Sequence, residues 1–441
     1  MRNLYLLLLI TFLLLSSCSH LSKTVQPEHT SAYIALYNNQ TDKARNLLNS
    51  TKDDSMKLFL FSSLELSEGN IEASKNYAIK LTNEYEDCPE GKILLNLIER
   101  REENPNESWI NAYTLAYKEA GSPELDFPLN IVFATNWVKA KIECDNKLEI
   151  PGTIRNTPKG LLLAYEKKMF SCNANEYFEL LLNTYSEMPY EIKLFIYNEF
   201  YTWHYNKSNI TDEVKKRSES KKIELIKELS NEEPSYMYFA ITDILEQAPN
   251  DGPLLENEIA MLEKAVSRNH FFKPSRYDLF NYYLTLFKEL NVDNPYSSAA
   301  EVTNSAYPVF PVNLLSKITE STKDADEQTK ERFAKILEKT SKAILKGRTL
   351  MDYTIGSLLL RRASNLRDDK ELEAIANEMF RFSHKLTFLS SSTSLYWPIT
   401  PLLNESISLS MKDEIGFMLT FTGEKIPENI SHLINDDYSV K

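Results

Sequence analysis

The chain has 441 residues, of which 42% are hydrophobic and 26% charged, and its formal net charge is −13. These proportions are ordinary for a globular protein, which argues against wholesale disorder and against a protein with many membrane spans. Ten residues are glycine, about 2% against a usual share of roughly 7%, so tight β-hairpins and glycine-rich phosphate loops are disfavoured. The negative charge disfavours nucleic acid as a partner.

The first 17 residues have the features of a bacterial export signal. Arg2 precedes an apolar run from Leu4 to Leu15 that only Thr11 interrupts. A helix needs about 20 apolar residues to cross a membrane. This shorter run is therefore typical of a signal peptide over residues 1–17, not of a spanning helix.

The apolar run ends in Leu15-Ser16-Ser17-Cys18, which resembles the lipobox of bacterial lipoproteins. The resemblance implies cleavage before Cys18 and acylation of that cysteine; the alternative is an ordinary secretory signal that happens to place a cysteine here. Two or three acyl chains hold a protein firmly to a membrane, whereas one gives only marginal attachment. In Gram-negative lipoproteins of this kind, a residue other than aspartate after the lipidated cysteine implies export to the outer membrane. Ser19 therefore implies an outer-membrane protein that faces the periplasm. Residues 18–30 are expected to be the lipidated cysteine and a polar tether.

From residue 31 to 127 the sequence predicts paired helices. Asn39–Ala44 and Gly69–Ser74 lie 30 residues apart, and each precedes apolar residues. Both segments resemble the turn and second helix of a tetratricopeptide repeat, in which a small residue lets two helices approach closely. The spacing is shorter than the usual repeat of about 34, the small residue slips by one position between the two units, and the Trp-Leu-Gly-Tyr pattern of a first helix is missing.

The predicted fold class is all-α. The resemblance implies helical hairpins stacked as an irregular, tetratricopeptide-like α-solenoid, and a compact multi-helix bundle is the alternative. Irregular stretches at 121–128 and 294–311 interrupt the helical pattern. They predict a middle helical region over 128–295 and a C-terminal helical region over 296–441.

The clearest helix lies at 324–347. Acidic residues near its start and lysines near its end suit the helix dipole. Gly347 is expected to take the left-handed conformation that ends the helix. Its apolar positions fall on one face, namely Phe333, Ile336, Leu337, Thr340 and Ile344.

Three cysteines remain besides Cys18, an odd number for an oxidising compartment. They are Cys88, Cys144 and Cys172. A disulfide between Cys144 and Cys172 is favoured, because they flank a segment rich in turn residues, and it would stabilise the fold by roughly 3 kcal/mol. The alternative is three buried thiols. Because the cysteines and histidines form no cluster in the sequence, neither a metal site nor a cofactor is predicted.

The sequence contains no recognisable catalytic motif, since zinc-protease, nucleophile-elbow, dinucleotide and phosphate-loop patterns are all missing. With 63 acidic residues, counting does not exclude a site made of two carboxylates. Glu149, Glu199 and Glu301 lie near irregular or aromatic segments. No catalytic residue is predicted.

Aromatic side chains are the most suggestive feature. One cluster occupies 190–205, and another pair lies in the irregular stretch 390–401. Core packing is one interpretation. The other is that surplus tyrosine and tryptophan line a groove for a peptide, glycan or partner helix. The candidate binding aromatics are Tyr197, Tyr201, Trp203, Tyr205, Tyr396 and Trp397.

Three functions are compatible with these observations. The leading hypothesis is a membrane-anchored, non-catalytic helical-repeat scaffold or adaptor that binds a protein or peptide partner in the bacterial envelope. The alternative is a lipoprotein that captures a solute or glycan for an outer-membrane transporter. A cell-wall hydrolase with two carboxylates is a third.

Overall fold

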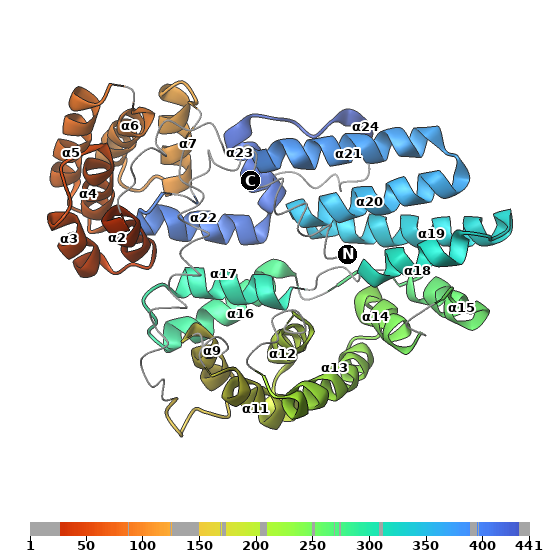
Figure 1. Cartoon of the computed structure of the whole chain (residues 1–441). Coiled ribbons are helices and arrows are strands. Elements are labelled where there is room, and N and C mark those ends of the chain that lie inside the picture. The colour runs from red at the N-terminus through yellow and green to blue at the C-terminus, as the bar shows by residue number, and fades with distance from the viewer. Residues whose placement is uncertain are drawn as a thin grey trace. The chain divides into compact units, whose positions relative to one another are not determined.

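In the computed structural model, every regular element of the described residues is a helix (Figure 1). This confirms the all-α class. The signal peptide, Cys18, Cys144 and Cys172 lie outside the described residues. No helix within the described ranges combines the length and the hydropathy that crossing a membrane requires. The structure describes residues 27–86, 88–123, 125, 150–167, 169, 173–202, 210–248, 252–268, 270–272, 275–307, 312–388, 395 and 397–431.

The chain divides into two compact units. The first comprises Met1–Lys139 with Ser391–Ser406, and the second Ala140–Ser390 with Ile407–Lys441. Residues 391–406, from the expected C-terminal region, thus belong to the first unit.

Six of the helices in the first unit form three consecutive hairpins. The two helices of each hairpin pack together, and neighbouring hairpins contact each other through α3 and α4 and through α5 and α6. Helix α2 starts at Pro27 and buries His29, so the part of the expected tether from residue 27 onwards is helical. The helices are α2 (Pro27–Tyr37), α3 (Thr41–Asn49), α4 (Ser55–Ser67), α5 (Ile71–Glu84), α6 (Pro89–Glu103) and α7 (Trp109–Glu119).

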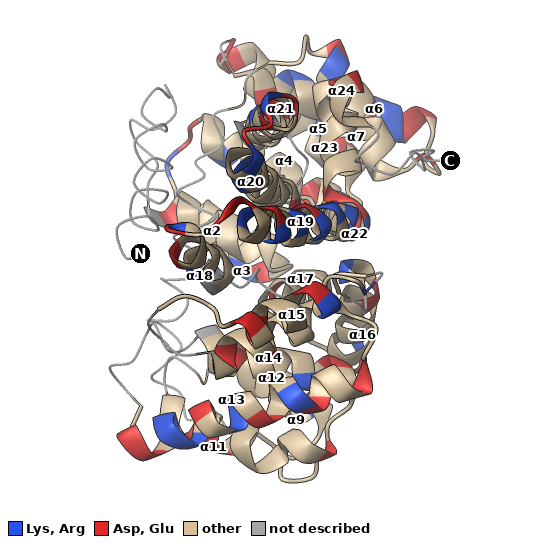
Figure 2. Ribbon diagram, turned by 90° about the vertical axis from the view of Figure 1, so that its right-hand side faces the viewer, with Lys and Arg blue, Asp and Glu red and all other residues tan. Residues whose placement is uncertain are grey.

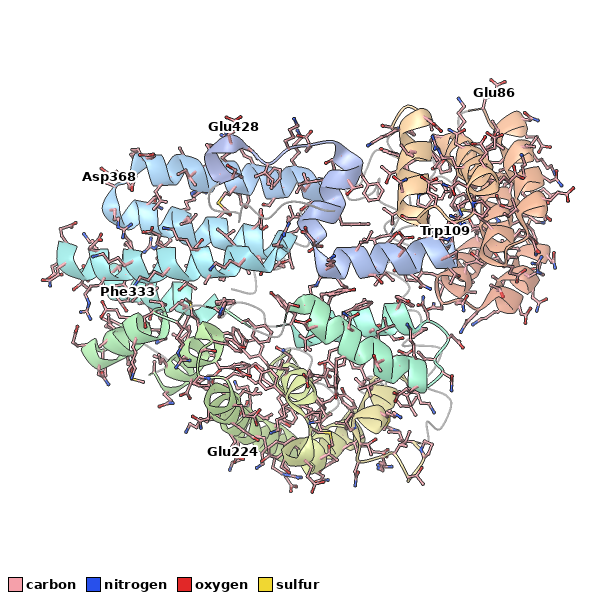
Figure 3. All side chains as sticks on the ribbon, turned by 180° about the vertical axis from the view of Figure 1, so that it is seen from behind. Glu86, Trp109, Glu224, Phe333, Asp368 and Glu428 are labelled. Carbon is pink, nitrogen blue, oxygen red and sulfur yellow. The ribbon has the colours of Figure 1, made fainter. Side chains whose placement is uncertain are left out.

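The turns between paired helices explain how a glycine-poor chain reverses direction. Gly69 takes the left-handed conformation, with φ of 82°, and Asn39 takes it in the equivalent turn, with φ of 58°. In both turns the next N–H group donates to the carbonyl five residues earlier at 2.8 Å. Asn291 and Asp368, the latter labelled in Figure 3, are also left-handed. Asparagine and aspartate tolerate this conformation better than other residues with a side chain.

A pair of serines marks the closest approach of α4 and α5. Ser62 and Ser74 are fully buried. The hydroxyl of Ser74 donates to the carbonyl of Ser62 at 2.8 Å, and the hydroxyl of Ser62 lies 3.0 Å from the carbonyl of Ser74. Ala44 follows the left-handed Asn39 by five positions, and Ser74 follows the left-handed Gly69 by five. Both are fully buried. The buried small residue therefore has the same position in the two units, without the one-position difference expected from the sequence.

The second unit holds the remaining helices, except that the division falls within α22 (Thr400–Lys412). The long helices α19, α20 and α21 pack in sequence order, whereas α12 packs against the distant α17. Besides the second part of α22, the described elements of the second unit are α9 (Pro158–Glu166), α11 (Ala174–Thr184), η3 (Tyr185–Glu187), α12 (Tyr190–Thr202), α13 (Asp212–Glu232), α14 (Met237–Gln247), α15 (Glu256–Ala265), α16 (Arg276–Glu289), α17 (Pro295–Ala306), α18 (Val312–Thr322), α19 (Glu327–Ile344), η6 (Leu345–Gly347), α20 (Leu350–Arg367), α21 (Lys370–Phe388), α23 (Glu414–Thr422) and α24 (Glu428–Ser431).

Helix α19 bears out its predicted apolar face. Phe333 (Figure 3) and the four other predicted positions are at most 2% exposed. Charged residues of both signs follow one another along α13 and α19 (Figure 2). Several pair across helices, as when Arg332 contacts Glu256 and Glu263 of α15 at 2.8 Å.

The prediction for Gly347 is wrong, because the left-handed residue is Arg348, with φ of 61°. Gly347 is required for a different reason. A Cβ atom at this position would lie 2.2 Å from Asp352 Oδ2 and 2.9 Å from the hydroxyl of Tyr307. Only a residue without a side chain allows this approach.

Candidate functional site

Trp397 belongs to the core of the first unit. Its side chain is 0% exposed. The ring packs edge-on between Phe59 of α4 and Tyr113 of α7, at centroid distances of 5.3 and 5.2 Å. Nearby, the carboxylate of Glu405 accepts a hydrogen bond from the backbone N–H of Trp109 at 2.8 Å. Because the ring is buried in the core, these contacts correct the assignment of Trp397 as a candidate binding aromatic.

The aromatic cluster on α12 is also largely core. Tyr197 is 0% exposed and packs edge-on against Tyr238 and Phe239 of α14, and burial raises its pKa. This corrects its assignment as a binding residue. Tyr201 is half-buried, with the Lys222 ammonium 5.7 Å from its ring centroid. Trp203, Tyr205 and Tyr396 lie outside the described residues.

Two of the candidate carboxylates lie close to buried tyrosines. Glu199, which is 5% exposed, accepts a hydrogen bond from the hydroxyl of Tyr177 at 2.9 Å. Glu301 accepts one from Tyr165 at 3.4 Å. Burial, and then the charges of Glu301 and Glu199, raise the pKa of Tyr165. The carboxylates thus take part in a polar network between helices, and Glu149 lies outside the described residues.

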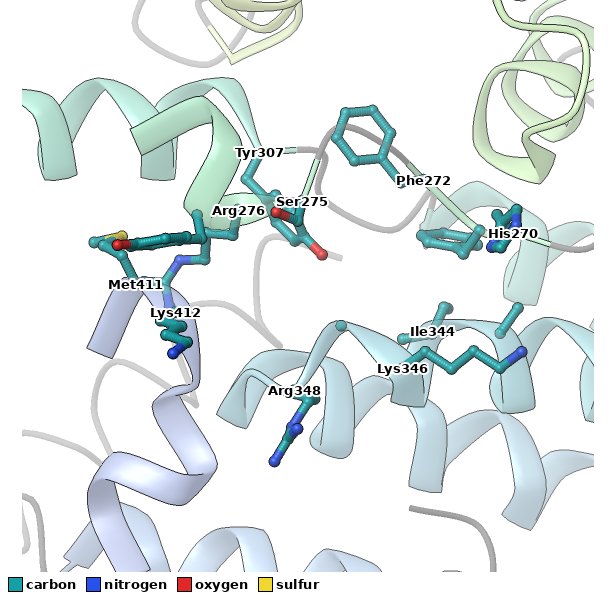
Figure 4. Close-up of a pocket in the computed structure, with 14 residues that line it drawn as sticks. His270, Phe272, Ser275, Arg276, Tyr307, Ile344, Lys346, Arg348, Met411 and Lys412 are labelled. Carbon is teal, nitrogen blue, oxygen red and sulfur yellow. The ribbon is translucent and has the colours of Figure 1, made fainter. Parts of the chain in front are cut away.

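The second unit contains a cavity of about 230 Å³ that no sequence pattern indicated (Figure 4). None of the described residues that line it is acidic, although the whole chain carries a charge of −13. Its basic side chains are Arg276, Lys346, Arg348 and Lys412. Its aromatic and apolar side chains include Phe271, Phe272, Tyr277, Tyr307, Ile344 and Met411.

Backbone hydrogen bonds fix one wall of this cavity. The N–H of Met237 donates to the carbonyl of His270 at 2.9 Å, and the N–H of Tyr238 donates to that of Phe271 at 3.0 Å. Segment 270–272 is thereby held at the start of α14. Ser275 caps α16 by accepting from the backbone N–H of Asp278 at 3.1 Å, and Arg276 follows as the first residue of α16.

Arg276 is held rigidly. Its side chain is 12% exposed. The guanidinium donates to Asn304 Oδ1 at 2.8 Å and to the carbonyl of Ser410 at 3.3 Å, and it lies 3.5 Å from Glu414 Oε2. The same Glu414 oxygen accepts from the backbone N–H of Leu350 at 3.1 Å. Much of the charge of Arg276 is therefore balanced within the chain.

Arg348 is held in a similar way. Its guanidinium pairs with Asp413 at 2.6 Å, and its carbonyl accepts from Ile415 N–H at 3.3 Å. A left-handed arginine costs roughly 1–3 kcal/mol, and such strain is often found at functional sites. Lys346 and Lys412 differ from the two arginines, because both are exposed and neither forms an ion pair with another described residue. Lys346 belongs to η6 and Lys412 to α22, and Figure 4 shows the two side chains well apart.

A second cavity of about 350 Å³ adjoins the first, and the two share Phe271, Arg276, Tyr307 and Ile344. Its own lining includes the carboxyl of Asp352, whose pKa is raised by burial to about 6. Burial, and then the charge of Asp352, raise the pKa of Tyr307. The second cavity is thus the more acidic of the two.

The lining of the first cavity combines basic groups with aromatic and apolar side chains, a combination that suits an anion attached to an apolar group. Among the described residues, no three His, Cys, Asp or Glu side chains group as a metal site would require. The chain matches no known protein family, and no curated protein or solved structure is detectably similar to it. Only folding brings residues 270–277 together with residues 344–348 and 411–412, so the sequence offered little signal beyond the neighbouring cations Lys346 and Arg348.

Proposed function

We propose that this chain is a lipid-anchored bacterial envelope protein that binds a protein partner without catalysing a reaction. The lipobox-like Leu15-Ser16-Ser17-Cys18 supports the anchor, and Ser19 supports an outer-membrane position facing the periplasm. In this proposal the hairpins of the first unit are an irregular repeat scaffold of the tetratricopeptide kind. The partner binds at the basic cavity of the second unit.

The observation that carries the proposal is the first cavity. Sites for small molecules usually have volumes of about 300–1,000 Å³, whereas this one has about 230 Å³. One anionic side chain or chain end fits such a volume, and an oligosaccharide does not. The burial of Trp397 and Tyr197 further weakens the glycan hypothesis, because neither ring is available for stacking on a sugar.

A capture experiment tests the proposal. The acylated wild type and the variant Lys346→Glu/Lys412→Glu are purified from detergent-solubilised envelopes. A stoichiometric partner should accompany the wild type and be lost from the variant, because charge reversal repels an anionic anchor. Recovery of no partner by the wild type contradicts the proposal. Intact-mass analysis checks the anchor, since acylation at Cys18 adds the mass of the lipid.

A second candidate function is the capture of a small anionic solute, which the adjoining cavity of about 350 Å³ favours. Titration calorimetry with dicarboxylates would detect it as saturable binding without any partner protein. Zymography on peptidoglycan tests the hydrolase hypothesis, for which the hydrogen-bonded Glu199 and Glu301 offer little support.

A further inference from the structure

We infer that a third cleft of the second unit, the Arg268 cleft, binds a carboxylate attached to a short aliphatic group. The cleft has a volume of about 210 Å³. Its lining comes from α13, α14 and α15, which pack in sequence order (Figure 1), and from the turn that follows α15. This inference goes beyond the proposed function, because the cleft shares no lining residue with the first or the second cavity.

The guanidinium of Arg268 has one occupied edge and one free edge. Its Nη1 donates to the carbonyl of Tyr236 at 2.6 Å, and this bond fixes the orientation of the side chain. Nε and Nη2 form the other edge, and they donate to none of the described residues. These two atoms can donate two parallel hydrogen bonds to one carboxylate. A single side chain therefore supplies the whole anchor.

The charge of Arg268 has no counter-charge among the described residues. Burial lowers the pKa of Arg268, and no neighbouring carboxylate offsets the effect. Arg276 and Arg348, by contrast, each contact a carboxylate of this chain. Asp243, an acidic residue of the Arg268 cleft, instead accepts a hydrogen bond from Gln247 at 2.7 Å. A bound carboxylate would supply the missing counter-charge.

The rest of the lining determines the kind of anion. Met261 is 46% exposed, so the cleft offers an accessible apolar surface to an aliphatic group. Lys264 is exposed and adds to the attraction for an anion, whereas the charge of Asp243 opposes a doubly charged phosphate. The volume is below the roughly 300 Å³ at which sites for small molecules begin. A singly charged carboxylate on a short chain, either a free acid or a glutamate side chain of a peptide, meets these conditions.

Titration calorimetry with the full chain, purified in detergent, tests the inference. The two probes are butyrate and a pentapeptide with blocked ends whose only carboxylate is a glutamate side chain. Saturable binding of at least one probe is expected, and it should weaken as ionic strength rises. Arg268→Gln should abolish it, and Arg268→Lys should weaken it about tenfold, because lysine cannot donate two parallel hydrogen bonds. The control Arg381→Gln changes an arginine outside the cleft whose side chain is 79% exposed, and it should bind like the wild type.

Met261→Glu gives a second test that leaves the bond between Arg268 and Tyr236 in place. Because Met261 is exposed, this variant should unfold in urea like the wild type, but its added carboxylate should prevent binding. Binding of butyrate alone identifies a free acid as the ligand, and binding of the peptide alone identifies a protein segment. The inference is overturned if neither probe binds, if Arg268→Lys or Met261→Glu binds as tightly as the wild type, if the control is weakened equally, or if inorganic phosphate binds more tightly than either probe. The capture experiment changes other residues, so the two tests can fail independently.

Discussion

Asp352 gives the sharpest test of the energetics of the second unit. Its side chain is 7% exposed and accepts a hydrogen bond from the backbone N–H of Thr349 at 3.1 Å. Burial nevertheless raises its pKa to about 6, whereas an aspartate in an unfolded chain has a pKa of about 4. The folded state thus binds the proton more tightly. The stabilisation from this group is fully present below about pH 4 and is lost as the pH rises through 6.

The size of the effect follows from the difference of about two pKa units. Each unit corresponds to about 1.4 kcal/mol, so ionisation of Asp352 costs the folded state about 3 kcal/mol at neutral pH. The variant Asp352→Asn keeps the shape and an oxygen that can accept from Thr349, but it carries no charge. Relative to the wild type, its free energy of unfolding should rise by about 3 kcal/mol between pH 4 and pH 8.

Urea unfolding followed by circular dichroism, at one-unit steps from pH 4 to pH 8, measures this difference. The pKa of Glu331 is lowered by its hydrogen bond from Arg367, and that of Glu263 by its hydrogen bond from Arg332. Their effects on stability run in the opposite direction, but they are common to both proteins and cancel in the difference. A difference that stays constant with pH, or that changes with the opposite sign, refutes the reasoning.

Three further substitutions test the packing. Gly347→Ala should lower the free energy of unfolding by about 2 kcal/mol, because its Cβ would lie 2.2 Å from a carboxyl oxygen; unchanged urea unfolding contradicts this. Trp397→Ala should cost about 3–5 kcal/mol, and Trp397→Phe clearly less. A loss below 1 kcal/mol would show that the ring is not core. Asn39→Val should cost about 1–2 kcal/mol because φ is 58°, whereas Asn39→Gly should leave the melting temperature nearly unchanged.

Local features of the sequence were sufficient to predict the helices and some of their turns. The apolar face of 324–347 and the turns at Asn39 and Gly69 depend on residues within one or two helical turns of each other, so neighbouring side chains determine them. The close packing of hairpin helices followed from small residues at a fixed distance after the turn. The lipobox-like segment is likewise a purely local pattern. It lies outside the described residues, so lipidation stays a prediction.

The tertiary structure decided which of these faces meet. An aromatic residue such as Trp397 has the same local pattern whether it fills a core or lines a groove, and only its packing against Phe59 and Tyr113 distinguishes the two. Gly347 likewise faces Tyr307 because of folding. The basic cavity gathers side chains from His270 to Lys412. Its net charge and volume depend on long-range packing, which no local periodicity encodes.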